Sequence, residues 1–360
     1  MSLHQEKATG LTADPNLRQP SMADVAALAG VSHQTVSRVL NDHPNVRPAT
    51  RDAVLDAIDQ LGYRRSSAAR ALASGHSSTI GVLTANSTNV GPLHMAIAIG
   101  EAAQENGYYV SLAPAANFTP EETHRRLNQL VEQGVDGIIA IVPHNEVALA
   151  VDSYSFPCPV VISAARPDIP ANSPGKYVYV DHGKGTQLAV DYLLELGHAK
   201  IWHIAGPENW IDATVRRDAY TAIMTKAGLT PVVLTAQGWT SQQGYEVGKE
   251  IAAAIKAGTG PTAVYAVNDD IAIGLYRALW EAGLAVPDDV SIVGFDDVEA
   301  AAFIVPSLTT LRQPFAEAGR ACIEALVDEI GGQSDPQPRI AAVLEPALVI
   351  RDSARSPAPH

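Results

Sequence analysis

From residue 78 onward, short apolar runs alternate with amphipathic stretches, and this alternation limits the possible fold more than any other feature of the chain. Apolar runs separated by helical patterns are typical of parallel strands that helices cover on both faces. The sequence therefore predicts an α/β protein. The predicted strands are Ile80–Leu83, Tyr109–Ala113, Gly137–Val142, Val160–Ile162, Tyr177–Val180, Ile201–Ala205, Val232–Thr235, Ala263–Val267 and Val290–Phe295.

So many strands exceed what one compact sheet usually holds. We therefore expect two lobes, each with its own parallel sheet, joined by a crossover near Val180–Asp181 and a return near Ser307–Leu311. The amphipathic stretches that predict the covering helices include Leu93–Asn106, Thr186–Leu196, Ala213–Ala227, Gly244–Ala257 and Ile271–Ala282.

The same patterns suggest how the chain is divided. We expect a disordered tail over residues 1–20, a small helical domain over 21–65, a hinge over 66–77, a two-lobed core over 78–350 and a tail over 351–360. Within the core, the first lobe is expected to hold about residues 78–180 and 311–338, and the second about 181–308 and 339–350.

Composition excludes several classes of protein. Two cysteines, Cys158 and Cys322, cannot build a disulfide framework or a cysteine-rich zinc site. Residues 1–20 lack the apolar core of a signal peptide, and no apolar run approaches the length of about twenty residues that a membrane span needs. We therefore expect a soluble, reduced, cytoplasmic protein with no membrane partner.

The formal net charge of −14 is unevenly distributed. Residues 21–76 hold six arginines against five aspartates, whereas residues 77–360 hold 17 basic against 32 acidic side chains. Screening hides charges beyond about 8–10 Å, so a near-neutral segment with arginines can bind phosphate next to an acidic body. The net charge therefore does not exclude nucleic acid as a partner.

Residues 21–63 have the pattern of three short helices. Ala23–Ala29 is the first, and Gly30 ends it, because glycine tolerates the left-handed backbone of a sharp turn. Ser32 is a suitable N-cap for a second helix from His33 to about Leu40, and Pro48 suits the first turn of a third. The positions expected to face a shared core are Val25, Leu28, Ala29, Val36, Val39, Leu40, Val54, Leu55, Ile58 and Leu61.

Polar side chains occupy the opposite face of the second helix. His33 and Ser37, and likewise Gln34 and Arg38, are four residues apart and share the outward face. Two short helices joined by a glycine turn, the second presenting such residues, form a helix-turn-helix DNA reader. Glutamine can pair with adenine and arginine with guanine. The alternative is a small helical cap with a solvated polar face.

The run from Met22 to Val82 resembles the N-terminal signature of the lactose/galactose repressor (LacI/GalR) family of bacterial transcriptional regulators. The pieces DVA-x-x-AGVS-x-x-TVSRVLN, TR, LGY, AR-x-L and IGV occur in the family's order and spacing. The resemblance implies that residues on the second helix read bases, namely His33, Gln34 and Arg38. It implies phosphate contacts or a role in helix register for Ser32, Thr35, Ser37 and Asn41, with capping as the alternative for Ser32 and Thr35.

Residues 66–77 stand where this family has a hinge that folds on the operator and inserts a leucine into the minor groove. Leu72 occupies that position, and Arg70 is expected to contact DNA beside it. An apolar wedge of this kind unstacks a base step and bends the DNA. A flexible linker with an incidental leucine is the alternative. The segment Arg64-Arg65-Ser66 departs from the Pro-Asn that is usual in the family.

Polar side chains follow several predicted strands at their carboxyl ends, where ligands of parallel sheets bind. Such groups beside an indole suit a sugar, because hydroxyls bond to them while an apolar ring face packs on the indole. The resemblance extends through VNDDIAIG, VGFDD, GW-T and LTTLRQPF and implies a periplasmic-binding-protein-like core. The expected effector contacts are Pro92, Asp181, Arg216, Trp239, Asn268, Asp296 and Gln313.

Some of these polar residues have other interpretations. Asn268 can act only as a helix N-cap, and Asp181 can serve the crossover rather than a ligand. Asp269 and Asp297 suit the surface or a contact between lobes equally well.

No catalytic, cofactor or metal site is expected. The segment Gly183–Thr186 resembles part of a phosphate loop but lacks its first glycine, and no G-x-S-x-G elbow occurs. His198 and His203 flank a strand without carboxylates at metal-ligand spacing, which favours structural roles. We therefore expect a protein that is not an enzyme.

The expected function is that of a repressor whose operator affinity is controlled by a small carbohydrate bound between the lobes. A homodimer would read a near-palindromic double-stranded DNA operator, and the final ARSPAPH carries no leucine heptads for tetramerisation. A galactoside is one candidate, although Ala164 and Asn117 replace the acidic residue and the arginine of lactose-type relatives. The alternatives are a corepressed regulator of the same fold that responds to a purine or another metabolite, and a sugar-binding protein that does not bind DNA.

Overall fold

The computed structural model describes residues 20–64, 75–85, 89–165, 169–170, 173–332 and 339–357. The chain forms two compact units, divided between Ser77 and Ser78. The expected DNA contacts Arg70 and Leu72 lie outside the described residues.

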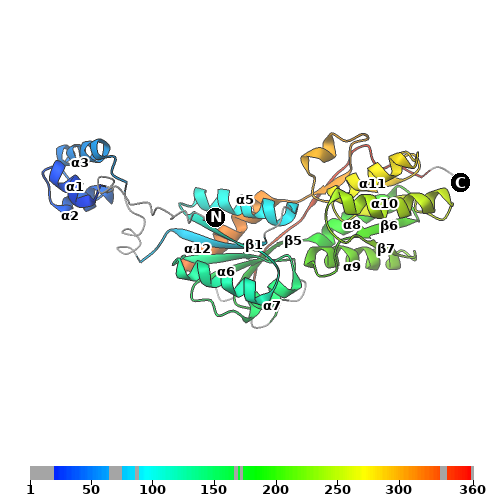
Figure 1. Cartoon of the computed structure of the whole chain (residues 1–360), viewed down its shortest axis with the longest axis horizontal. Coiled ribbons are helices and arrows are strands. Elements are labelled where there is room, and N and C mark those ends of the chain that lie inside the picture. Colours follow the sequence, from blue (N-terminus) through cyan, green and yellow to red (C-terminus); the bar gives the residue numbers. More distant parts are fainter. Residues whose placement is uncertain are drawn as a thin grey trace, which may run out of the picture. The chain divides into compact units, whose positions relative to one another are not determined.

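The first unit consists of three helices, α1 (Met22–Leu28), α2 (His33–Leu40) and α3 (Pro48–Leu61) (Figure 1). Ser21 begins α1 with a capping box, in which its side chain and that of Asp24 each bond to the other's backbone. Gly30 adopts a φ of 65° in the turn before α2, as the sharp turn requires. These local signals fix the helix ends in the absence of a large core.

The core of this unit is small, with Val25, Val36 and Val54 fully buried at its centre. The prediction that Leu28 and Leu55 face this core is wrong, because they are 50% and 48% exposed. A three-helix unit offers each helix only one inner face. Leu28 is the last residue of α1, and Leu55 is turned away from the face that holds Val54.

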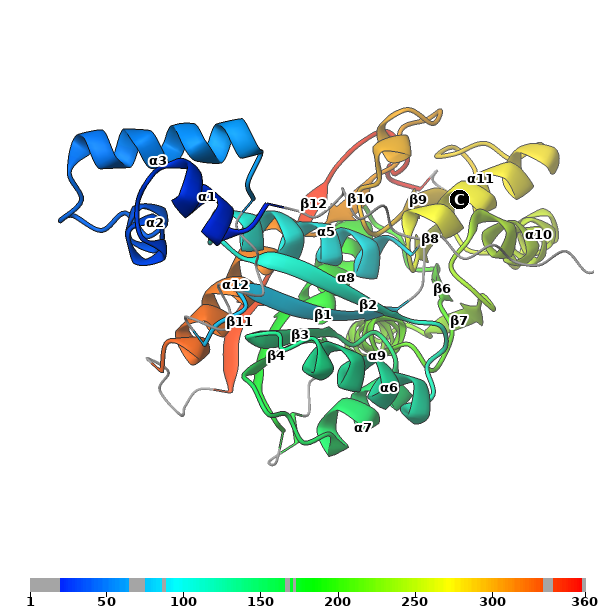
Figure 2. The same cartoon turned by 60° about the vertical axis from the view of Figure 1, so that its left-hand side comes forward.

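The first lobe of the second unit is a parallel six-stranded sheet in the order β11-β5-β4-β3-β1-β2. Helices α5 and α12 pack on one face, and α6 and α7 lie on the other (Figures 1 and 2). The elements are β1 (Thr79–Ala85), α5 (Val90–Glu105), β2 (Tyr109–Ala115), α6 (Pro120–Glu132), β3 (Gly137–Ile141), α7 (Asn145–Ser153), β4 (Val160–Ser163), β5 (Lys176–Val180), α12 (Phe315–Ile330) and β11 (Ile340–Leu344).

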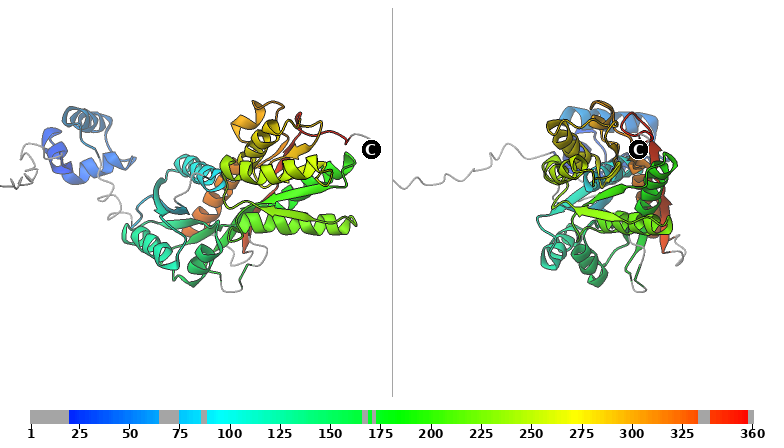
Figure 3. Two further views of the ribbon diagram at one scale, coloured as in Figure 1. Left: turned by 45° about the vertical axis from the view of Figure 1, so that its right-hand side comes forward. Right: turned by 90° about the vertical axis from the view of Figure 1, so that its right-hand side faces the viewer.

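The second lobe is a parallel four-stranded sheet in the order β7-β6-β8-β9, with α10 and α11 on one face and α8 and α9 on the other (Figures 1 and 3). An antiparallel pair, β10 with β12, runs beside it. The elements are α8 (His182–Glu195), β6 (Ile201–Ala205), α9 (Ile211–Lys226), β7 (Val232–Thr235), α10 (Ser241–Lys256), β8 (Ala263–Ala266), α11 (Asp269–Glu281), β9 (Ser291–Val293), the 3₁₀ helix η1 (Glu299–Ala302), β10 (Thr310–Arg312) and β12 (Ala347–Val349).

The predicted α/β architecture with two parallel sheets is confirmed, and each of the nine predicted apolar runs contains a strand. The structure differs from the expected division of the lobes at residues 339–344. Residues 340–344 form β11 in the first lobe, where Ile340 pairs with Tyr177, and are not part of the second lobe. The chain therefore crosses between lobes a third time, between β11 and β12. The residues of β11 form an apolar run, IAAVL, but such a run does not show which strand it pairs with.

The expected tail also differs in its first part. Ser353 is fully buried, and its carbonyl accepts a hydrogen bond from Ile292 N at 2.8 Å while its hydroxyl accepts one from Thr309 N at 2.8 Å. His198 Nε2 reaches Arg355 O at 2.8 Å. Residues 351–357 therefore cover the edge strand β9 of the second lobe.

Two aspartates next to β9 join this edge to the crossings between lobes. Asp269 accepts hydrogen bonds from Thr310 Oγ1 at 2.6 Å and from Val298 N at 2.9 Å. Asp297 forms ion pairs with Arg312 at 2.6 Å and Arg351 at 2.5 Å. Both residues therefore have structural roles, which fix the loop after β9.

Helices α10 and α11 approach closely because glycines line their contact. A Cβ on Gly274 would lie 2.0 Å from Ser241 O and 2.6 Å from Tyr245 N, which are backbone atoms that cannot rotate away. A Cβ on Gly100 of α5, by contrast, would meet no atom within 4 Å.

Substituting Gly274 by alanine should lower the free energy of unfolding of the second unit by about 3 kcal/mol, because the added methyl group must push the two helices apart. Urea unfolding followed by circular dichroism measures the change. Gly100→Ala is the control and should leave the stability unchanged or raise it, since alanine favours a helix. Equal effects of both substitutions would contradict this account of the helix contact.

Candidate DNA-reading helix and ligand cleft

Helix α2 presents the predicted base-reading residues on its exposed face. His33, Gln34 and Arg38 are exposed, whereas Val36 and Val39 on the other face are buried in the small core. The helix is thus held by its apolar side and leaves its polar side accessible, which is the arrangement that major-groove reading needs.

The remaining predicted DNA contacts on this helix make local hydrogen bonds. Ser32 Oγ caps α2 by accepting from Thr35 N at 3.2 Å, and it lies 2.9 Å from Thr35 Oγ1. Asn41 Nδ2 donates to Ser37 Oγ at 3.4 Å. The capping interpretation of Ser32 is therefore confirmed, and phosphate contacts from these four residues stay a prediction.

Two adjoining cavities form a cleft between the lobes of the second unit. They share Gly91, Pro92, Asp212 and Gln313 in their walls. Lobe one contributes the start of α5, and lobe two contributes the carboxyl ends of β6, β8 and β9. This is where ligands of parallel sheets bind.

Six of the seven predicted effector residues line the smaller cavity, namely Pro92, Arg216, Trp239, Asn268, Asp296 and Gln313. Asp181 lines neither cavity. Its side chain is the N-cap of α8 and accepts a hydrogen bond from Lys184 N at 2.8 Å. Asp181 thus serves the crossover, which was its alternative interpretation.

Asp296 is the most constrained residue of the cleft. It is 9% exposed, has a φ of 121°, and accepts a hydrogen bond from Gln313 Nε2 at 2.6 Å. Burial raises the pKa of its carboxyl group to about 7, although Arg216 and Gln313 oppose the change. A carboxyl group in a strained backbone, held beside a cavity, is typical of a binding site.

Arg216 lies at the back of the cleft and is 2% exposed. Its Nε and Nη2 donate to His182 Nδ1 at 3.2 Å and 2.9 Å, and its Nη1 donates to Val267 O at 2.5 Å. The guanidinium also covers the ring of Phe295 at 3.6 Å. Its Nη2 is 3.9 Å from Asp296 Oδ1, which is too long for a hydrogen bond and leaves room for a shared partner.

His182 connects Arg216 to a second carboxylate. Because its Nδ1 accepts from Arg216, the ring carries its proton on Nε2, which lies 3.6 Å from Asp212 Oδ1. Burial and the neighbouring guanidinium hold the pKa of His182 well below its ordinary value, so the ring is neutral. Burial raises the pKa of Asp212.

Asn268 is a helix N-cap and also lines the smaller cavity, and its contact with an effector stays a prediction. Its Oδ1 caps α11 by accepting from Ile271 N at 2.9 Å, and its Nδ2 donates to Trp239 O at 3.1 Å. The second bond holds Trp239 at the smaller cavity. There the indole of Trp210 meets Trp239 edge to face, with ring centroids 5.2 Å apart. The two indoles form an aromatic corner.

Sequence reasoning missed Trp210, Asp212 and His182, although a signal for two of them existed. Trp210 and Asp212 follow the carboxyl end of β6, where polar and aromatic residues were sought after the other strands. His182 follows Asp181 at the start of α8, and the sequence gives no separate signal for it.

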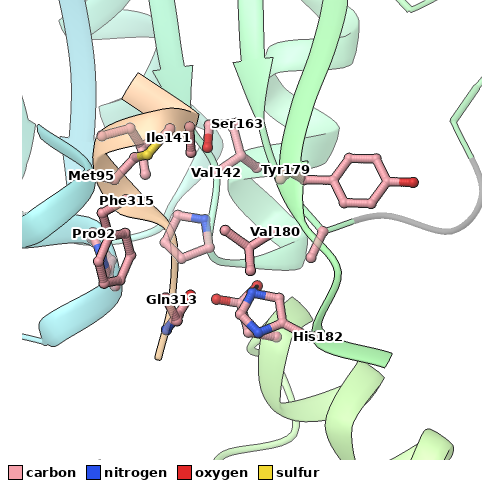
Figure 4. Close-up of a pocket in the computed structure, with 16 residues that line it drawn as sticks. Pro92, Met95, Ile141, Val142, Ser163, Tyr179, Val180, His182, Gln313 and Phe315 are labelled. Atoms are coloured by element: carbon pink, nitrogen blue, oxygen red, sulfur yellow. Dashed lines mark ion pairs between the residues drawn. The ribbon is translucent and has the colours of Figure 1, made fainter. Parts of the chain in front are cut away.

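The larger cavity continues the cleft along a mainly apolar wall. Figure 4 shows Met95, Val142 and Phe315 around it, with Gln313 and His182 at its polar end and the ring of Tyr179 directed away. A ligand here can place polar groups among the charged residues and apolar groups against this wall.

The two lobes also touch directly at the edge of the cleft. Ile211 N donates to Pro143 O at 2.9 Å, and Asn145 N donates to Asn209 O at 3.1 Å. His144 stacks on Phe118 at 4.6 Å and meets Trp210 edge to face. These contacts hold the loops after β3 and β6 together in the described structure.

Two general findings bear on other classes of function. Among the described residues, no group of three or more His, Cys, Asp or Glu side chains is placed to hold a metal ion. No helix in the described part of the chain is long and apolar enough to cross a membrane.

Comparisons with known proteins all find similarity to bacterial transcriptional regulators. Residues 21–66 match the family described as bacterial regulatory proteins, lacI family, and residues 190–354 match the periplasmic binding protein-like domain. The lactose operon repressor of Escherichia coli (strain K12) is 31% identical over 319 residues, which cover 88% of this chain and 87% of that protein. The HTH-type transcriptional repressor PurR of Haemophilus influenzae (strain PittEE) is 32% identical over 341 residues, covering 93% and 99%.

A solved structure agrees with these relatives. The lac repressor dimer bound to operator and the anti-inducer ONPF superposes with a TM-score of 0.84 at 30% sequence identity, covering 94% of this chain and 100% of that one.

Replacing Asp296 by asparagine should remove one source of pH dependence. The folded pKa of about 7 lies above the ordinary value of about 4, so the stability that the protonated carboxyl contributes is lost as the pH rises through 7. Between pH 6 and pH 8 the wild type should therefore lose about 1 kcal/mol relative to Asp296→Asn. Chemical denaturation of both proteins across this range measures the difference, in which the shared histidine titrations cancel. Parallel pH profiles would show that Asp296 is ionised throughout.

Proposed function

The chain belongs to the LacI family of bacterial regulatory proteins, and on this premise we propose that it is a sequence-specific DNA-binding transcriptional repressor whose operator affinity is controlled by a small carbohydrate. The relatives compared above are named as repressors, and the superposed structure holds operator DNA and a small ligand. We propose no catalytic activity.

The exposed polar face of α2 carries the DNA-binding part of this proposal. Arg38 and Gln34 can reach base edges in the major groove while Ser32, Thr35, Ser37 and Asn41 contact phosphates or keep the helix in register. His33 begins the helix beside them and is exposed. In this proposal Leu72 and Arg70 contact the minor groove at the centre of a near-palindromic operator.

The gap between Arg216 and Asp296 carries the effector part. A sugar hydroxyl between them can accept from the guanidinium and donate to the carboxylate, which the 3.9 Å separation permits. Asn268 and Gln313 offer further amide groups, and the indole of Trp239 offers a surface for the apolar face of a sugar ring.

Control of DNA binding follows from the position of the cleft. The start of α5 in one lobe and Arg216, Trp239 and Asp296 in the other all line it, so a ligand contacts both lobes at once. The ligand changes the balance between two arrangements of the lobes only as far as its affinity for them differs. We propose that the favoured arrangement releases the operator and relieves repression.

We further propose a homodimer, since a two-fold operator requires two readers. Leu93 and Ile97 lie four residues apart on α5 and are exposed, as are Tyr109 and Leu112 on the neighbouring strand β2. Exposed apolar side chains gathered on adjacent elements are typical of an interface between subunits.

A purine corepressor is the second candidate for the effector, because PurR is as similar to this chain as the lactose repressor is. The amide and carboxyl groups of the cleft can also bond to the edge of a purine, and the aromatic corner can hold its ring. A thermal-shift screen that includes both sugars and purines, described below, distinguishes the two effector classes.

Substituting Arg38 by alanine should weaken operator binding by about 10- to 100-fold and relax the base preference at one position, since one bidentate base contact contributes about 1–3 kcal/mol. Selection of binding sites from random DNA identifies the operator, and fluorescence anisotropy then measures affinity. Arg277→Ala on α11 removes an exposed arginine outside the first unit and should leave affinity unchanged. Unchanged affinity for the Arg38 variant would show that another face of the unit reads DNA.

A thermal-shift screen should identify the effector class. We expect a sugar among galactosides, glucosides, pentoses and polyols to raise the Tm of the wild type but not that of Asp296→Ala, because the hydroxyl bridge needs the carboxylate. Asp218→Ala, on the exposed side of α9, is the control and should respond as the wild type does. A response to purines alone would replace the carbohydrate by a corepressor.

A further inference from the structure

The charged groups of the cleft are unusually one-sided. Among the described residues that line the two cavities, the charged side chains are Asp212, Asp296 and Arg216, and all three belong to the second lobe. The first lobe contributes backbone, apolar and uncharged polar groups to the same walls. Two carboxyl groups thus stand against a single cation.

That cation is already engaged by the protein. Three of the five N–H groups of the Arg216 guanidinium donate to His182 Nδ1 and Val267 O, and its planar face covers the ring of Phe295. Recognition of a phosphate or carboxylate group commonly uses a guanidinium that is free to bond through two parallel N–H groups. Here Nη2, which carries a second N–H, lies 3.9 Å from Asp296 Oδ1.

His182 cannot add a second positive charge. Its Nδ1 accepts two hydrogen bonds from Arg216, and protonation of this atom would place a cation against the guanidinium. The neutral ring therefore lies between Arg216 and Asp212 and supplies no positive charge for an anionic ligand.

Three helices of the second lobe that begin at the cleft are also unsuited to an anion. Helix N-termini are common anion sites because their free N–H groups and dipole attract negative charge. In the second lobe, the side chain of Asp181 accepts from the first turn of α8, and that of Asn268 accepts from the first turn of α11. Asp212 places a carboxyl group in the first turn of α9. The protein supplies its own acceptors at each of these three ends.

The uncharged parts of the cleft favour a ring with an apolar face. Trp210 and Trp239 meet at an interplanar angle of 68° beside Asp212, so a ligand enters a corner with two aromatic walls. The C–H face of a pyranose or furanose packs on such a wall, whereas a phosphate would lose its hydration there without gaining a cation.

Resting on the proposed function, we propose that the cleft selects uncharged sugars and rejects the phosphorylated and carboxylated forms of the same sugar, with Asp212 as the residue that discriminates against them. Asp212 lines both cavities, so an anionic substituent bound in either one lies in a cavity that contains this carboxylate. Repulsion between like charges in a partly dehydrated cleft acts against each anionic form.

Matched sets of ligands test this selectivity. The sets are D-galactose, D-galactose 6-phosphate and D-galacturonate; D-glucose, D-glucose 6-phosphate and D-glucuronate; and D-ribose with D-ribose 5-phosphate. Isothermal titration of the full-length protein at neutral pH should detect an uncharged member and find its charged forms at least about 30-fold weaker, which is about 2 kcal/mol. A phosphorylated or carboxylated form that binds as tightly as its parent overturns the selectivity while leaving a sugar as the effector. If no sugar in any set binds and a purine does, the result overturns both the proposed effector class and this inference.

An Asp212→Asn variant tests the assigned residue. The substitution keeps the size of the side chain and removes its charge, so the ratio between uncharged and phosphorylated affinities should narrow by about tenfold. Asp218→Asn makes the same change on the same helix at an exposed position and should keep the wild-type ratio. Circular dichroism confirms that both variants are folded. An unchanged ratio in a folded Asp212→Asn protein would remove Asp212 from this role and assign the selectivity to the occupied guanidinium.

Discussion

The buried guanidinium of Arg216 connects the parts of the second lobe that form the cleft. It bonds to His182 at the start of α8, to the carbonyl of Val267 after β8, and packs on Phe295 after β9. A buried charge is costly unless its donors are satisfied, so these three segments are held to one arrangement. The crossover into α8 and the ends of two strands therefore meet at a fixed place, and the cleft lies in front of them.

Asp296 connects the same cleft to the chain segment that returns to the first lobe. Its backbone N donates to Leu311 O at 2.8 Å, its carboxyl group accepts from Gln313, and its neighbour Asp297 is tied to Arg312 and Arg351. The strained φ of Asp296 is thus maintained by bonds to the segment that returns to the first lobe. In the proposed function, a ligand that engages this carboxyl group binds a residue that is hydrogen-bonded to the crossing segment.

The strands were predictable from the sequence because a buried parallel strand must be apolar along its whole length, and such runs are visible without an alignment. Much of the cleft was predictable for a related reason, since the carboxyl ends of these strands converge in this fold. Features set by tertiary contact were not. The apolar run of β11 does not show that it pairs with β5 in the first lobe. Ser353 is buried because it bonds to β9 and the neighbouring Thr309, and Leu28 and Leu55 are exposed because three short helices share one small core. The spacing of residues in the sequence also does not show that Arg216 donates hydrogen bonds to His182.

Charge separates the two units of the chain. The arginines near the N-terminus face nearly equal numbers of aspartates, while the remainder of the chain is strongly acidic. An acidic core contributes little nonspecific attraction to DNA, so affinity must come from the exposed face of α2 and from the segment that follows it. Because no general electrostatic attraction compensates, a small change in the relative position of the two α2 helices of a homodimer should have a large effect on operator affinity. The same acidic character continues into the cleft, where two carboxyl groups outnumber one occupied cation. Under the proposals above, the first unit binds a polyanion whereas the cleft disfavours anionic ligands.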